Sequence, residues 1–200
     1  MENSFIRISC IGDSITAGFG LEDWEDSYPN QLYYLLGGGY IINPYLGKDG
    51  AAVWRHSLLP YKSTDEYFEA IFWETDIMII CLGTNDTEYS INDSFCEEFK
   101  EDYKVLISAL SNANPNPNAR VYLCTIPPMF GSQNASFAAK VSIINALIAD
   151  VAEGCEASLI DINGAMASKP DLFSDGIHPN AMGAKIIAET VASAIERIVL

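Results

Sequence analysis

Short apolar runs alternate along the chain with longer segments in which apolar residues recur every three or four positions. The short runs are typical of strands buried in a parallel sheet and cover Phe5–Ile11, Tyr40–Ile42, Asp76–Leu82, Arg120–Ile126 and Ser158–Ile162. The longer segments predict helices over Pro29–Leu36, Ser94–Leu110, Ser136–Val151 and from Pro179 to the C-terminus. This alternation predicts an α/β fold in which helices cover both faces of a five-stranded parallel sheet.

Local signals support the predicted helix ends. The run Gly37-Gly38-Gly39 is typical of the residues that follow a helix. Ser94 and Glu97 have the spacing of a capping box, which predicts that Ser94 starts its helix. Pro179 suits a first helical turn, where its missing N–H has no partner to lose.

The chain has the size and composition of one globular domain. It has 200 residues, of which 49% are hydrophobic and 19% charged, which is enough to bury a substantial core without disulfide or metal support. The Asn- and Pro-rich stretch Ser111–Ala119 is short enough to be a surface loop, and there is no other candidate linker. We therefore expect a single domain over residues 1–200.

The charge balance excludes several classes of partner. Eleven Lys and Arg residues stand against 27 Asp and Glu residues, giving a net charge of −16. Such a surface repels phosphate backbones and anionic lipids, so nucleic-acid binding is not expected. The longest apolar run, Ile77–Leu82, is far shorter than the ~20 residues of a membrane span, so no membrane insertion is expected.

The N-terminal residues Met1–Phe5 have neither a basic segment nor an apolar one. The chain as it stands therefore carries no signal peptide, which predicts a cytoplasmic protein, or a periplasmic or secreted one if a leader has been removed.

The cysteines are odd in number and form no C-x-x-C pair, and Cys10, Cys81 and Cys124 lie in apolar runs. They are typical of small buried residues in a reducing compartment, and no metal site is predicted.

Polar clusters from distant parts of the sequence follow the predicted strands. They are Gly12–Ser14, Gly47–Gly50, Gly83–Asp86 and Asp175–His178. Because the carboxyl ends of parallel strands meet at one edge of a sheet, and ligands bind there, the four clusters are expected to form one site.

These clusters contain the groups that acyl transfer needs. Ser14 requires a base to become a nucleophile, and His178 is a candidate because Asp175, three residues earlier, could orient its ring. The backbone N–H groups of Ser14 and Gly50 and the amide of Asn85 are candidate donors to an oxyanion. Each cluster alone is also typical of an ordinary turn, so the prediction of a site rests on the order of all four clusters along one edge of the sheet.

With these residues identified, the chain resembles the SGNH hydrolases, also called the GDSL esterase/lipase family. The matching motifs are Gly12-Asp13-Ser14-Ile15, Gly83-Thr84-Asn85-Asp86 and Asp175-Gly176-Ile177-His178-Pro179, which together span almost the whole chain. The resemblance implies a three-layer α/β/α sandwich similar to flavodoxin and no metal or organic cofactor. It implies that Ser14 is the nucleophile, His178 the general base and acid, and Asp175 its partner. It also implies an oxyanion hole formed by Ser14, Gly50 and Asn85.

The motif that supplies the glycine donor departs from the family's usual Gly-x-Ser-Gly-like stretch. Here it reads Gly47-Lys48-Asp49-Gly50, so either Gly50 or Gly47 could supply the N–H. The carboxylate of Asp49 would weaken oxyanion binding unless it pairs with Lys48 or points to solvent.

Within the family, Tyr122–Pro128 and Asp175–Ala188 are most similar to bacterial carbohydrate O-acetylesterases. This resemblance implies a serine esterase that removes short acyl groups, chiefly acetyl, from a small-molecule or oligosaccharide ester. Trp24, Trp54 and Arg55 are candidate substrate contacts, and local packing is the alternative role for such side chains. Two other functions fit the same fold: a broad short-chain esterase or thioesterase, and a non-catalytic carbohydrate-binding protein.

Overall fold

A computed structural model describes residues 5–196 of the chain. Five parallel strands form one sheet: β1 (Ile6–Gly12), β2 (Tyr40–Gly47), β3 (Ile77–Cys81), β4 (Arg120–Cys124) and β5 (Ser158–Ile160). Their spatial order is β2-β1-β3-β4-β5, which is the order of flavodoxin-like sheets. The predicted five-stranded parallel sheet is therefore confirmed.

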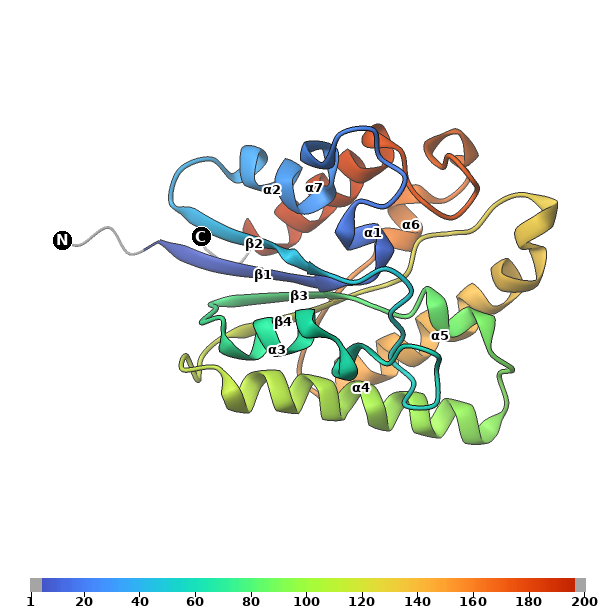
Figure 1. Cartoon of the computed structure of the whole chain (residues 1–200), viewed down its shortest axis with the longest axis horizontal. Coiled ribbons are helices and arrows are strands. Elements are labelled where there is room, and N and C mark those ends of the chain that lie inside the picture. The colour runs from blue at the N-terminus through green and yellow to red at the C-terminus, as the bar shows by residue number, and fades with distance from the viewer. Residues whose placement is uncertain (1–4, 197–200) are drawn as a thin grey trace.

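Helices cover both faces of the sheet and complete three layers (Figure 1). One layer contains α1 (Ser14–Ala17), α2 (Tyr28–Leu36), α6 (Ile162–Met166) and α7 (Ala181–Glu196). The opposite layer contains α3 (Asp65–Phe72), α4 (Asp93–Ala113) and α5 (Ala135–Gly154). The predicted α/β/α sandwich is confirmed.

Alternation along the strands divides the buried side chains between two cores. In β3, Met78 and Ile80 pack on the side of α3, α4 and α5, whereas Ile77 and Ile79 pack on the side of α2 and α7. A central strand with both faces covered has no polar side, which explains its continuous apolar run.

Several predicted boundaries differ from the structure. β2 extends to Gly47, beyond the predicted Ile42, because it is an edge strand that tolerates Pro44. The cap of α4 is Asn92, whose side chain accepts the Phe95 N–H at 2.9 Å, so the assignment of Ser94 as the cap was wrong. Ile162 starts α6 instead of ending β5. The last helix is described as far as Glu196, and the rest of its predicted extent lies outside the described residues.

One helical stretch within residues 5–196, from Ser132 to Gly154, is long and apolar enough to cross a membrane by length and composition alone. The sequence pattern had predicted no such segment. Its apolar face packs into the core through side chains that include Ile144, Ile148 and Val151, all fully buried. Core helices pass the same test, so this stretch is weak evidence for a membrane span.

Candidate active site

Ser14 lies where β1 turns into the short helix α1. Asp13 caps this helix, and its Oδ1 accepts the Ile15 N–H at 3.0 Å. Gly12 makes the turn possible, because a Cβ at this position would collide with the side chain of Thr16. Ser14 is therefore held in the first turn of a helix, where backbone N–H groups have no partner within the helix.

A rigid loop before α7 carries Asp175 and His178. Oδ1 of Asp175 accepts the backbone N–H groups of Ile177 at 2.8 Å and His178 at 2.7 Å. Gly176 has a φ of +86°, and any side chain there would collide with the carbonyl of Phe130. These contacts fix the loop so that both side chains point the same way.

The structure brings Ser14, His178 and Asp175 into one hydrogen-bonded row. Nδ1 of His178 lies 2.7 Å from Oδ2 of Asp175, and its Nε2 lies 3.0 Å from Oγ of Ser14. Partial burial alone would raise the pKa of Asp175, but hydrogen bonds from His178 and Ile177 lower this pKa to about 2. An ionised carboxylate only accepts hydrogen bonds, so Nδ1 donates to Asp175. In the neutral ring, Nε2 is then free to accept the Ser14 hydroxyl proton.

Two further donors face the same region. A tight turn, closed by the Ala51 N–H on the Lys48 carbonyl at 3.1 Å, places Gly50 at a φ of +74°. Within residues 5–196, the Gly50 N–H makes no hydrogen bond. Asn85 donates one amide hydrogen to the Ala51 carbonyl at 2.8 Å, and its second hydrogen remains for a ligand.

The structure distinguishes between the two candidate glycines. Gly50 lines the pocket that contains Ser14, whereas Gly47 ends β2 and packs closely against the backbone of Ala17. The charges beside the turn are also separated. Lys48 pairs with Glu66 at 3.1 Å, and Asp49 is exposed at the rim of the pocket.

The pocket at these groups has a volume of about 230 Å³. One part of its lining is apolar and comes from Phe19, Met129, Phe137 and Ile177. The polar part, besides the groups already described, contains Thr84, Thr87, Asp49 and Glu88. A site of this size accommodates a short acyl group and part of an alcohol.

The three aromatic or basic side chains expected to contact substrate lie outside this pocket. Trp24 stacks on Tyr45 with ring centroids 5.1 Å apart. Trp54 packs between Tyr89 and Phe95 and donates its indole N–H to Glu98 at 2.8 Å. The structure therefore gives both tryptophans packing roles.

The basic residues near Trp54 are also engaged elsewhere. The guanidinium of Arg55 binds Glu101 at 2.6 Å and Asp102 at 2.8 Å on α4. His56, the other histidine of the chain, is exposed, and its Nε2 lies 3.9 Å from Glu98. Neither side chain lines the pocket that contains Ser14.

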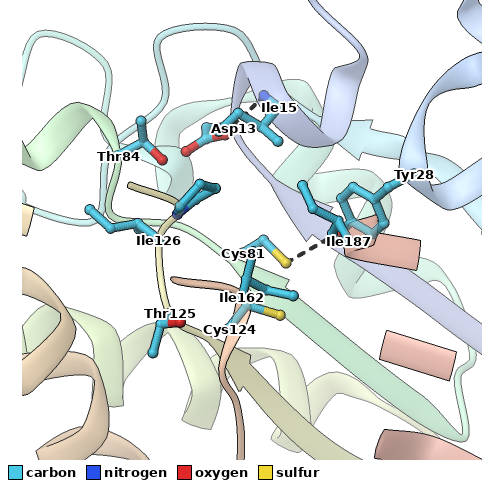
Figure 2. A pocket seen from close by; sticks show the side chains of 11 residues that line it. Asp13, Ile15, Tyr28, Cys81, Thr84, Cys124, Thr125, Ile126, Ile162 and Ile187 are labelled. Atoms are coloured by element: carbon cyan, nitrogen blue, oxygen red, sulfur yellow. Dashed lines mark hydrogen bonds between the residues drawn. The ribbon is translucent and has the colours of Figure 1, made fainter. Parts of the chain in front are cut away.

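A second, much smaller cavity lies near the buried Asp13 side chain (Figure 2). Its volume of about 10 Å³ is at the lower limit for one water molecule, so it cannot hold an ester. Asp13 and Thr84 border it, together with Tyr28, whose hydroxyl donates to Sγ of Cys81 at 3.4 Å. Burial raises the pKa of Asp13 to about 6.

Sequence reasoning did not find two residues that the structure places at this site. Phe19 packs on His178 with ring centroids 4.7 Å apart, although no motif marks it. The sequence marks Asp86 only as the last residue of the motif Gly83–Asp86. Its buried carboxylate accepts the N–H groups of Val53 and Trp54, both at 2.9 Å, and fixes the segment after Gly50. Its place beside Asn85 was the signal that could have indicated this role.

Known proteins resemble this chain over most of its length. Residues 10–186 match the GDSL-like lipase/acylhydrolase family. An acetylxylan esterase of Xylanibacter ruminicola is 32% identical over 96% of this chain, which spans 43% of that protein's length. An isoamyl acetate-hydrolyzing esterase of Schizosaccharomyces pombe is 26% identical over 96% of this chain and 76% of its own.

Solved structures show the same fold. Est24, a carbohydrate acetylesterase from Sinorhizobium meliloti, superposes with a TM-score of 0.77 at 19% identity, covering 96% of this chain and 99% of its own. At that identity the likeness concerns the fold alone. The match over most of the chain and the site at the carboxyl edge of the sheet lead to one conclusion: the chain belongs to the GDSL-like lipase/acylhydrolase family.

Proposed function

We propose that this chain is a serine esterase that hydrolyses short acyl esters, chiefly acetyl, on carbohydrates. The observation that carries the proposal is the row in which His178 lies 3.0 Å from Oγ of Ser14 and 2.7 Å from Asp175. The family match and the similarity to an acetylxylan esterase support the reaction and the substrate class.

In the proposed reaction, Nε2 of His178 takes the hydroxyl proton while Oγ of Ser14 attacks the ester carbonyl. The carbonyl oxygen becomes negative and accepts hydrogen bonds from the Ser14 N–H, the Gly50 N–H and the Asn85 amide. His178 then gives its proton to the departing alcohol, leaving Ser14 acylated. Water, deprotonated by the same nitrogen, releases the acid and regenerates the serine.

Asp175 has an electrostatic and an orienting role in this scheme. Because its pKa is lowered to about 2, it stays ionised throughout the neutral and mildly acidic range. It therefore stabilises the imidazolium that forms during attack and keeps the ring in one tautomer.

The test is acetate release from a panel of acetylated sugars, with p-nitrophenyl acetate and butyrate alongside, for the wild type and Ser14→Ala. The proposal expects turnover by the wild type only, with acetylated sugars among the best substrates. Retained turnover in Ser14→Ala would exclude the serine mechanism. Binding of sugars without any turnover would identify a carbohydrate-binding protein on the same fold.

A broader short-chain esterase is the second candidate, and the similarity to an isoamyl acetate-hydrolyzing esterase favours it. The mechanism would be the same, but the alcohol would be a simple alkyl group. Higher kcat/KM on alkyl or butyryl esters than on acetylated sugars would support this second candidate.

A further inference from the structure

Phe19 is a large apolar side chain that the fold holds at the pocket and leaves half exposed. The residue is 51% exposed, although it lines the pocket that contains Ser14 and His178. Its backbone is fixed, because the Phe19 N–H donates to the Ser14 carbonyl at 2.9 Å. Gly18 and Gly20 on either side have φ values of +79° and +81°, so the chain turns sharply on both sides of this residue.

The position of the Phe19 ring identifies the part of the substrate it would meet. Its centroid lies 4.7 Å from that of the His178 ring, whose Nε2 faces Ser14. In the proposed reaction this nitrogen protonates the oxygen of the departing alcohol, so the alcohol must lie beside the imidazole. In the same reaction, the carbonyl oxygen of the ester faces the Gly50 N–H and the Asn85 amide instead.

We infer that Phe19 is a specificity-determining residue that packs against the ring of a sugar alcohol in the ester substrate. This inference rests on the proposed esterase function and assigns its alcohol subsite. The faces of a pyranose ring carry C–H groups, and an exposed aromatic face buries them favourably.

Other aromatic side chains are less suited to this role. Phe137 lines the same pocket but packs against the core that α4 and α5 share. Trp24 stacks on Tyr45, and Trp54 packs among aromatic neighbours, and neither lines the pocket. Phe19 therefore combines a largely free ring with contact to the proton-donating histidine.

The experiment compares two substrates that share the acetyl group and differ in the alcohol: an acetylated methyl xyloside and ethyl acetate. Phe19→Ala is expected to lower kcat/KM on the xyloside about 10-fold, chiefly through KM, because apolar contact area is lost. On ethyl acetate, the same change should alter kcat/KM by less than about threefold. Phe19→Tyr keeps the aromatic ring and should therefore restore kcat/KM on the xyloside relative to ethyl acetate.

Trp24→Ala is the matched control, since it removes an exposed aromatic ring outside the pocket and should leave both substrates unaffected. An equal loss on both substrates in Phe19→Ala would overturn the inference, because the ring would then serve only to pack His178. No change on either substrate would overturn it as well.

A binding measurement separates this inference from the esterase proposal. The acetylated xyloside is titrated into Ser14→Ala and into Ser14→Ala/Phe19→Ala, and Kd should rise about 10-fold in the second. If the wild type releases no acetate but binding depends on Phe19, the esterase proposal fails and the sugar subsite stands. Equal Kd values in the two variants would overturn the subsite whether or not the wild type is active.

Discussion

The carboxylate of Asp86 holds the backbone of Trp54, whose N–H donates to Oδ1 at 2.9 Å. Oδ2 of the same carboxylate accepts the neighbouring Val53 N–H at 2.9 Å. Asn85, the preceding residue, binds the Ala51 carbonyl. Two consecutive side chains thus anchor the segment that follows Gly50, and the direction of the free Gly50 N–H depends on them.

Asp86→Asn should therefore impair catalysis, although Asp86 does not line the pocket. An amide offers one oxygen and one NH2 group to two backbone donors, so one hydrogen bond is lost and two donors face each other. We expect kcat to fall about 10- to 100-fold, because small displacements of an oxyanion donor are costly, while KM changes little. Steady-state kinetics on p-nitrophenyl acetate measures both values.

Asp102→Asn is the matched control for this change. Asp102 accepts the Arg55 N–H at 2.7 Å, farther along the same segment from Gly50. Asp102→Asn should lower the free energy of unfolding but leave kcat within about threefold of the wild type. A loss of kcat equal to that of Asp86→Asn would mean that the whole segment, and not the Asp86 anchor, sets the rate.

The same carboxylate should make folding stability depend on pH. Burial raises the pKa of Asp86 to about 7 in the folded chain, against about 3.9 in an unfolded one. Between these values the folded state binds more protons, so the free energy of unfolding should fall as pH rises from about 4 to 7. Asp13, with a pKa raised to about 6, contributes in the same direction.

Urea unfolding at several pH values between about 4 and 7.5 measures this dependence. Asp86→Asn should be less stable than the wild type, and its stability should decline less steeply over that range. A wild type whose stability rises steadily across the range would contradict the prediction. Asp175, with its pKa lowered to about 2, stabilises the fold by a constant amount across this range, and that contribution is lost only as pH falls from about 4 toward 2.

Asn85→Ala should reduce kcat by about 10²–10³, because it removes one donor to the oxyanion. Its contact with the Ala51 carbonyl is lost as well, so thermal unfolding should be measured alongside activity. If the variant folds and kcat falls less than about threefold, the amide does not serve as a donor.

The charges at the rim predict discrimination against anionic substrates. Asp49 and Glu88 line the pocket, and no Lys or Arg is among its described lining residues. An acetylated uronic acid should therefore have a lower kcat/KM than the corresponding neutral acetylated sugar, most clearly at low salt.

The double variant Asp49→Asn with Glu88→Gln should reduce the difference in kcat/KM between the neutral and the anionic ester, mainly by raising kcat/KM on the anionic ester. Asp23→Asn with Glu153→Gln removes two exposed charges outside the pocket, so it is the charge-matched control and should leave the ratio unchanged. An unchanged ratio in the double variant would show that the rim carboxylates do not select substrates.

Much of the fold was accessible from the sequence because central strands such as β3 carry continuous apolar runs. The helix α3 was missed, although Thr64 caps it and Asp65 and Glu66 occupy its first turn. Its eight residues are too few to show a clear period beside the aromatic-rich sequence around them. The five-residue α6 is shorter still and shows no period at all.

The candidate site divides in the same way. The sequence predicted that Ser14, Asn85 and His178 lie at one site, because they stand in short motifs whose placement follows from the sheet, and the structure places all three at one pocket. Phe19 was missed because its position beside His178 depends on where a turn directs an apolar ring. Trp54 was expected at the substrate because it follows the Gly50 turn, but its indole N–H is bound by Glu98 on α4.

Ser14 and His178 are 164 residues apart in the chain, yet their side chains meet. The first half of the sequence contains the proposed nucleophile and the three proposed oxyanion donors, whereas the proposed base lies in the loop before α7, after β5 along the chain. A growing polypeptide would therefore hold an unactivated serine until the segment after β5 has been synthesised. In refolding experiments, recovery of ester turnover would report the meeting of these two distant segments, which is a different event from the pairing of β1 with β3.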